Sequence, residues 1–269
     1  MHRMEMKTES RPPNGKGMRR LLFLVVGVLA LASLPAMAQE PDARAIVEAS
    51  VKYYRGDASE ATVAMTIHRP TWERTLVIRA WTKGQKESLF HIIAPPKDEG
   101  NGTLKKGQEM WTYNPKVNRV IKLPPSMMSQ SWMGSDFSNN DLAKSDSILD
   151  DYTHTIQGVK EENGHKVYII DSVPKPGAPV IWGKQRLFIR EDHILLREEF
   201  YDEDGRLVKA MTGRQIEMLG GKLFPRFWRM QKADAPGEYT ELDYRKLEFK
   251  KDLPDRLFTL AALRNPPRR

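Results

Sequence analysis

Cysteine is absent from the 269-residue chain. Without thiols the chain has no disulfide framework, no thiolate-bound zinc, no thiol nucleophile and no N-terminal cysteine to carry a lipid anchor. Apolar residues make up 40% of the chain and charged residues 29%, a balance typical of a folded protein. The missing disulfides matter because the N-terminus has the pattern of an export signal.

Motifs that would identify an enzyme or a metal site are also lacking. No two of the six histidines lie within five residues of each other, so there is no HExxH signature, and neither GxSxG nor GxGxxG occurs. The stretch Asp202–Gly205 resembles a calcium loop only in part, because no acidic residue closes a 12-residue loop. We therefore expect a protein that is not an enzyme, with no catalytic residue, no metal ligands and no cofactor.

Residues 18–38 have the three parts of a secretory signal peptide. Met18–Arg20 is basic, Leu21–Leu34 is almost entirely apolar, and an Ala-Met-Ala site ends at Ala38. The apolar run has 14 residues, whereas a membrane span needs about 20, so cleavage is favoured over an uncleaved anchor. We expect a signal peptide over 1–38, with residues 1–17 as an artefact of an upstream start, and one periplasmic domain over 39–269.

The basic net charge of the chain comes largely from this signal. Residues 1–38 carry six Lys or Arg and two Asp or Glu, which leaves 37 basic and 33 acidic residues, a net charge of +4. Proteins that bind nucleic acid cluster Lys and Arg along one face, and here both signs are interspersed. No nucleic-acid partner is expected.

An alternation of apolar and polar residues with a period of two dominates the rest of the chain, and it predicts β-strands. The predicted strands are 61–68, 75–82, 87–93, 109–113, 119–123, 166–173, 184–190, 195–201, 207–216, 223–232 and 239–249. Glycine turns such as Asp204-Gly205 and Gly220-Gly221 separate them. No alternation of strands with helices appears, so the pattern indicates one large antiparallel sheet in a mainly β protein.

Three short segments have helical spacing instead. Pro41–Tyr54 is amphipathic and ends at Gly56, and Asn139–Leu149 is predicted as one or two helical turns. Pro254–Leu263 is predicted as a third helix, with Asp252 as its N-cap. So few helices can cover only part of a sheet of this size, which should curve strongly and leave a concave space filled by side chains or by a ligand.

A methionine-rich segment, residues 127–137, lies between the two groups of strands. Large apolar side chains are concentrated there among Ser and Gly, with Asn139 and Asn140 close behind, where a simple connection would be polar. Flexible thioethers suit a surface that adapts to varied ligands. Two interpretations stay open for this segment: it faces a ligand, or it folds into the core.

Four stretches of sequence resemble the outer-membrane lipoprotein-sorting family related to LolA. They are Trp-Thr-Tyr-Asn-Pro (111–115), Arg-Val-Ile-Lys-Leu-Pro-Pro-Ser (119–126), Met-Gly-Ser-Asp-Phe-Ser (133–138) and Asn-Asp-Leu (140–142). The similarity spans about residues 41–262. It implies a half-barrel of about eleven antiparallel strands, with helices over its concave side that enclose an apolar cavity for acyl chains.

The resemblance implies a periplasmic carrier for a lipoprotein or a lipid, with an inner-membrane exporter or an outer-membrane acceptor as partner. The acyl chains of such a cargo must be shielded from water, because each methylene group exposed to water costs about 0.8 kcal/mol. The candidate lipid-binding residues are Met127, Met128, Trp132, Met133 and Phe137 in the methionine-rich segment, and Trp81, Phe90, Trp111, Phe188 and Trp228 in the sheet. The residues alone do not fix which strand face points inward.

Two other functions remain open at this stage. One is an envelope sensor or adaptor that binds a lipid signal or docks on a membrane exporter, which predicts an exposed apolar patch outside the cavity. The other is a hydrolase of envelope glycans or lipids, in which Asp136 or Asp141 acts as a general acid or base.

Overall fold

The computed structural model of the protein describes residues 41–144 and 147–267, so the predicted signal peptide lies outside the described residues. Thirteen described strands form one antiparallel sheet, in the order β6-β5-β4-β3-β2-β1-β13-β12-β11-β10-β9-β8-β7. The strands are β1 (Ala58–Arg69), β2 (Trp72–Lys83), β3 (Glu87–Ala94), β4 (Gly102–Lys106), β5 (Glu109–Asn114), β6 (Arg119–Lys122), β7 (Tyr152–Glu162), β8 (His165–Pro174), β9 (Lys184–Arg190), β10 (Leu195–Tyr201), β11 (Leu207–Leu219), β12 (Lys222–Lys232) and β13 (Tyr239–Lys250).

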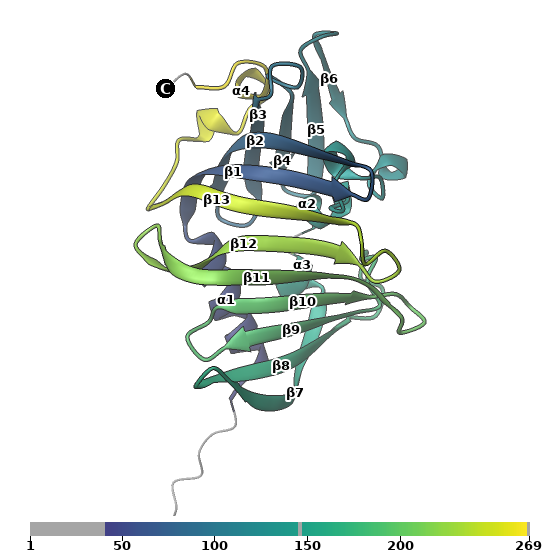
Figure 1. Cartoon of the computed structure of the whole chain (residues 1–269), viewed down its shortest axis with the longest axis vertical. Coiled ribbons are helices and arrows are strands. Elements are labelled where there is room, and N and C mark those ends of the chain that lie inside the picture. The colour runs from purple at the N-terminus through teal and green to yellow at the C-terminus, as the bar shows by residue number, and fades with distance from the viewer. Residues whose placement is uncertain (1–40, 145–146, 268–269) are drawn as a thin grey trace, which may run out of the picture. The chain divides into compact units, whose positions relative to one another are not determined.

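The first and last strands lie side by side in the middle of the sheet. Ala58–His68 of β1 pairs with Tyr239–Lys250 of β13, so two groups of strands meet at this pair. Figure 1 shows the strand direction turning strongly between β9–β12 and β3–β5. The predicted fold class, one curved and unclosed antiparallel sheet, is confirmed, with thirteen strands where about eleven were expected.

Strands β4 and β7 account for the difference. Gly102 begins β4, and a Cβ atom at this position would lie 2.8 Å from the Leu263 side chain. Glycine is therefore required there for close packing and not for a bend. Strand β7 at the sheet edge has exposed Thr153 and Thr155 and few apolar residues, so it gives a weak strand signal.

The helices are short, and local caps define their ends. They are α1 (Ala43–Arg55), α2 (Asn139–Ala143), α3 (Ser147–Asp150) and α4 (Leu260–Arg264), with single 3-10 turns at η1 (Pro125–Met127), η2 (Trp132–Gly134) and η3 (Asp255–Leu257). Asp42 caps α1 by accepting a hydrogen bond from the backbone N–H of Arg44, and Gly56 ends the helix with φ 62°. Ser138 and Asp141 form a reciprocal capping box on α2. No helix among the described residues has the length and apolar character that crossing a membrane requires.

The two faces of the sheet have different covers. The inner, concave face lies under α1, α2, α3 and the methionine-rich segment. The outer face of β1–β5 lies under the C-terminal segment, residues 253–264, whose Phe258 and Leu263 are fully buried against Trp81, Leu89 and Leu104. The single helix predicted over Pro254–Leu263 is therefore two short turns, η3 and α4, and it covers the outer face. The chain turns between them at Phe258, and Thr259 caps α4.

Candidate functional site

Two adjoining hollows lie between the inner face and its helical cover. The first, which we call the α1 hollow, has a volume of about 210 Å³ and lies among α1, α2, β9 and β10. The second, the β1 hollow, has a volume of about 230 Å³ and lies over β1, β2 and β3. Both are lined by Tyr54, Arg55, Phe137, Asp141 and Met211. The shared lining makes them neighbouring parts of one site.

Helix α1 forms one wall of the α1 hollow because of its spacing. Val47, Ser50, Val51 and Tyr54 recur every three or four residues and therefore lie on one helix face, turned toward the hollow. Opposite them, Leu187 and the other apolar residues of β9 and β10 complete a wall of aliphatic and aromatic carbon.

Small side chains make room for the β1 hollow. Its floor is built from Ala61 and Val63 of β1 and from Ala80 of β2, all nearly fully buried. Ala61 pairs with Ala80 across the two strands, so no large side chain projects inward at that point. The surrounding wall is apolar, which is the lining expected of a ligand pocket.

An aromatic cluster lies at the junction of the two hollows. The Tyr54 ring stacks on Phe224 at 5.2 Å between centroids and meets Trp228 edge-on at 5.4 Å. The Tyr54 and Tyr244 hydroxyl oxygens are 2.8 Å apart and share a hydrogen bond. Burial raises the pKa of both phenols, which keeps this junction uncharged.

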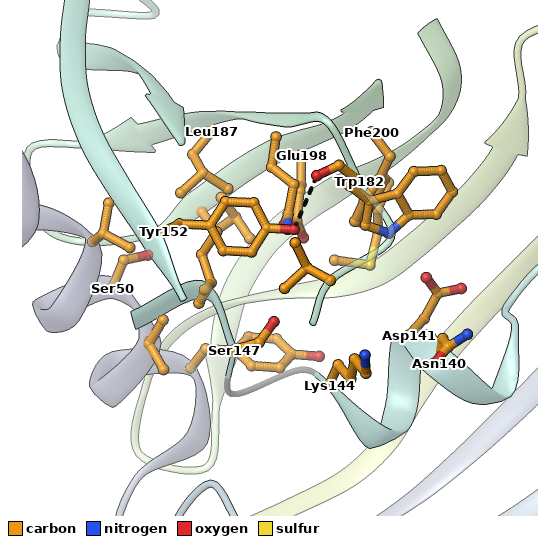
Figure 2. Close-up of a pocket in the computed structure, with 18 of the residues that line it drawn as sticks. Ser50, Asn140, Asp141, Lys144, Ser147, Tyr152, Trp182, Leu187, Glu198 and Phe200 are labelled. Atoms are coloured by element: carbon orange, nitrogen blue, oxygen red, sulfur yellow. Dashed lines mark hydrogen bonds between the residues drawn. The ribbon is translucent and has the colours of Figure 1, made fainter. Parts of the chain in front are cut away.

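A polar corner interrupts the apolar wall of the α1 hollow. Figure 2 shows Glu198 and Tyr152 of the sheet on one side, with Asp141 and Lys144 on the other. Asp141 forms a buried ion pair with Lys209 of β11, whose ammonium also lies 5.1 Å from the centre of the Trp182 ring. The Tyr152 hydroxyl donates to the backbone oxygen of Trp182 at 3.3 Å.

Glu198 is the acid in this corner whose pKa is raised above its usual value. Desolvation and, to a smaller extent, the nearby charge of Asp141 raise its pKa from 4.5 to about 7, against the opposing effect of Lys209. A carboxyl group in an apolar pocket is therefore close to half-protonated at neutral pH.

Asp136 attaches the methionine-rich segment to the sheet. Its carboxylate, fully shielded from solvent, accepts hydrogen bonds from Arg69 of β1 at 3.1 and 3.0 Å and from the Thr240 hydroxyl of β13 at 2.7 Å. Its oxygens are thus occupied by structural partners, and Asp141 is held by Lys209. Asp136 therefore lacks the free, solvent-reachable carboxyl group that a general acid or base would need, whereas Asp141 lines both hollows.

Three of the ten candidate lipid-binding residues line the hollows. Phe90 and Trp132 line the β1 hollow, and Phe137 lines both. Trp132 is fixed there by its indole N–H, which donates to the Thr103 hydroxyl at 3.0 Å. Trp228 also lies on the inner face, fully buried against Tyr54 behind the lining.

The other six candidates lie away from the hollows. Trp81 and Trp111 are on the outer face under the C-terminal segment. Phe188 is also on the outer face, because its neighbours Leu187 and Ile189 line the α1 hollow and strand residues alternate. The methionines of the methionine-rich segment pack into the core: Met127 and Met128 against Met110 and Leu123, and Met133 beside Trp132.

Sequence reasoning missed most of the lining residues for an identifiable reason. It favoured large aromatic residues, whereas the empty volume adjoins small ones such as Ala61 and Ala80. The helical spacing over 41–54 correctly predicted the apolar face of α1, but it did not indicate that this face lines a hollow. Glu198 and Asp141, far apart in sequence, have no shared motif.

Comparisons with known proteins agree with this fold. A family model described as an uncharacterized protein family matches residues 84–265, more than half of the chain. No curated protein matches the sequence significantly.

Three solved structures superpose on most of the chain. A DUF1329 family protein from Desulfovibrio piger is 26% identical, with a TM-score of 0.72, over 83% of this chain and 100% of that one. A LolA superfamily protein from Nitrosomonas europaea is 24% identical, with a TM-score of 0.69, over 82% and 99%. An outer membrane lipoprotein-sorting protein domain from Vibrio parahaemolyticus is 21% identical, with a TM-score of 0.70, over 83% and 98%. The chain belongs to the matched family. It shares its fold with these three proteins, one of which is a LolA superfamily protein and one a lipoprotein-sorting domain.

Proposed function

We propose that this protein is a periplasmic carrier that holds the acyl chains of a lipoprotein or a lipid in its two hollows and moves them between the envelope membranes. The observation that carries the proposal is apolar space that the protein's own side chains leave empty. Each hollow exceeds the cavity of about 150 Å³ that binds benzene, and together they fall in the range of about 300 to 1,000 Å³ typical of ligand sites.

The chemistry of the lining suits transfer as well as binding. A long acyl chain in water costs on the order of 10 kcal/mol, so a carrier must shield it. Delivery requires that the acceptor hold the cargo more tightly than the carrier does. A mostly apolar wall with few directional contacts gives that moderate hold. An inner-membrane exporter and an outer-membrane acceptor are the proposed partners.

Filling the β1 hollow tests the proposal. Ala80→Phe places a ring in the space that Ala80 leaves open, and the exposed Ala233 offers the same substitution as a control. The probe is the uncharged N-undecyl dansylamide, and its binding is followed by fluorescence titration. We expect the unmodified protein and Ala233→Phe to bind it alike, and Ala80→Phe to bind it at least tenfold more weakly.

Two results together would overturn the carrier proposal. Absence of probe binding by the unmodified protein, together with lipid-free recovery from the periplasm in native mass spectrometry, would exclude it. A protein partner captured stably under those conditions would favour the sensor or adaptor.

Export through residues 1–38 is part of the same proposal. The expected mature N-terminus is Gln39, read by N-terminal sequencing of the periplasmic protein. Ala38→Arg should block cleavage, because the processing site requires a small residue there. An intact N-terminus on the unmodified protein would indicate an anchored form.

A further inference from the structure

The polar corner of the α1 hollow has hydrogen-bond acceptors that the described protein does not use. Asp141 has a side chain that is 7% exposed, and its Oδ1 atom is buried without a hydrogen-bond partner, while Oδ2 accepts from Lys209. Buried polar atoms without partners are uncommon in folded proteins and call for an explanation. Asp141 lines both hollows, so the unused oxygen belongs to the candidate site.

Glu198 adds a second unused acceptor on the opposite wall. Its side chain lines the α1 hollow, and no hydrogen bond to its carboxyl group is found among residues 41–144 and 147–267. The two carboxyl groups are close enough that the charge of Asp141 disfavours the ionisation of Glu198. They come from different elements, α2 and β10, that face each other across the hollow.

The cations around this corner already have partners. Lys209 pairs with Asp141, Lys144 donates to the backbone oxygen of Pro179, and Arg55 donates to Gly84 and Ser88. The site therefore offers two carboxyl acceptors beside an apolar wall. A carboxylate or phosphate brings no donor to these acceptors, whereas a protonated amine donates several hydrogen bonds and can satisfy both.

We propose that the α1 hollow is a headgroup site for amphiphiles bearing a protonated amine, with the ammonium between Asp141 and Glu198 and the tail along the apolar wall. This inference rests on the proposed carrier function and specifies the chemical class of its cargo. The amine supplies a donor for Asp141 Oδ1, which is buried without a partner, and for Glu198, to which no residue in 41–144 or 147–267 donates.

Proton linkage gives the site a measurable signature. The charged groups around Glu198 are Asp141 and Lys144 at α2, Arg55 of α1 and Lys209 of β11, and the phenols of Tyr54 and Tyr152 lie near it. Ammonium binding favours the ionised form of Glu198, whose pKa in the free protein is about 7. Binding should therefore tighten about tenfold from pH 5.5 to pH 8, a range in which an alkylammonium stays charged.

The experiment compares three probes with the same tail: decylammonium, 1-decanol and decanoate, titrated into the protein by calorimetry. We expect decylammonium to bind at least tenfold tighter than 1-decanol at pH 8, and decanoate to bind most weakly. Decylammonium binding at pH 6.5 should also release protons, seen as a heat that depends on the ionisation enthalpy of the buffer.

Variants separate the headgroup site from the tail site. Glu198→Gln keeps the shape of the side chain and should reduce the preference for decylammonium and flatten its pH dependence, with 1-decanol binding unchanged. Glu199→Gln is the control. Glu199 is the next residue of β10 and forms an ion pair with Arg197, so this substitution should leave the preference for decylammonium and its pH dependence unchanged.

Each remaining outcome has one meaning. Equal binding of the three probes, or a preference that survives in Glu198→Gln, overturns the headgroup site and leaves the carrier intact. Failure of all three probes to bind refutes the carrier and the headgroup site together.

Discussion

Asp136 is the residue that ties the cover of the hollows to the middle of the sheet. It accepts hydrogen bonds from Arg69 and Thr240, which lie on the paired central strands β1 and β13. Removing one member of a buried ion pair costs about 3 to 5 kcal/mol, because the other charge stays buried without its partner. Arg69 keeps a contact with Glu238 at 3.4 Å, which reduces that cost.

We therefore expect Asp136→Ala to lower the free energy of unfolding by about 3 kcal/mol, as measured by urea denaturation. Asp234→Ala, at an exposed position, is the matched control and should change it by less than 0.5 kcal/mol, about the usual limit for surface sites. A loss below 1 kcal/mol for Asp136→Ala would mean that the pair does not hold the segment.

Glu198 gives a second test at the residue scale, through pH. Its folded-state pKa of about 7 exceeds the usual 4.5, so the folded protein binds a proton more readily than the unfolded chain does. The stability from this group is complete below pH 4.5 and is lost as the pH rises through 7. With allowance for partial solvent access, the loss is about 2 kcal/mol.

Urea denaturation of the unmodified protein and of Glu198→Gln at pH 5 and pH 8 measures this loss. From pH 5 to pH 8 the unmodified protein should lose about 2 kcal/mol of unfolding free energy relative to the variant, because the variant lacks the titrating group. A difference that stays constant across this range would show that the Glu198 pKa is not raised.

Strand orientation marks the limit of what the sequence predicts. The alternation correctly located eleven strands, but β1 and β2 are buried on both faces, so apolar residues occur at both parities. Trp81 and Ala80 illustrate the ambiguity: the tryptophan packs under the C-terminal segment, and the alanine adjoins the hollow. Only the position of the covering segments, which the period of the strands does not encode, decides between them.

At the scale of elements, the C-terminal segment serves as the cover of the outer face. Phe258 is fully buried among Trp81, Leu89 and Leu104, and Leu260 two residues later is 42% exposed. Substituting alanine for a buried phenylalanine removes apolar contacts and leaves a cavity, at a cost of about 3 to 5 kcal/mol.

Phe258→Ala should therefore destabilise the protein by about 3 kcal/mol or more, and Leu260→Ala by less than 1 kcal/mol, in the same denaturation assay. Exposure of Trp81 should also shift the tryptophan emission of Phe258→Ala to the red before global unfolding. Equal effects of the two substitutions would argue that the segment is only loosely attached.

At the scale of the whole described domain, the pairing of β1 with β13 joins sheet halves that are built from different stretches of the chain. Strands β2–β6 extend from one side of this pair and β12–β7 from the other, so each half reaches the other only through it and through the inner cover. Met65, fully buried in β1 opposite Leu242 of β13, lies at this junction. A cavity at Met65 should therefore weaken both halves together.

We expect Met65→Ala to lower the free energy of unfolding by about 2 to 5 kcal/mol and to shift both halves to lower urea concentration by the same amount. Hydrogen exchange with mass spectrometry, read separately on peptides from β2–β5 and from β8–β11, measures the two transitions. Coincident transitions mean that the central pair couples the whole sheet into one cooperative unit. If the peptides of β8–β11 kept the midpoint of the unmodified protein, the two halves would fold independently, and the hollows beneath them would open one at a time.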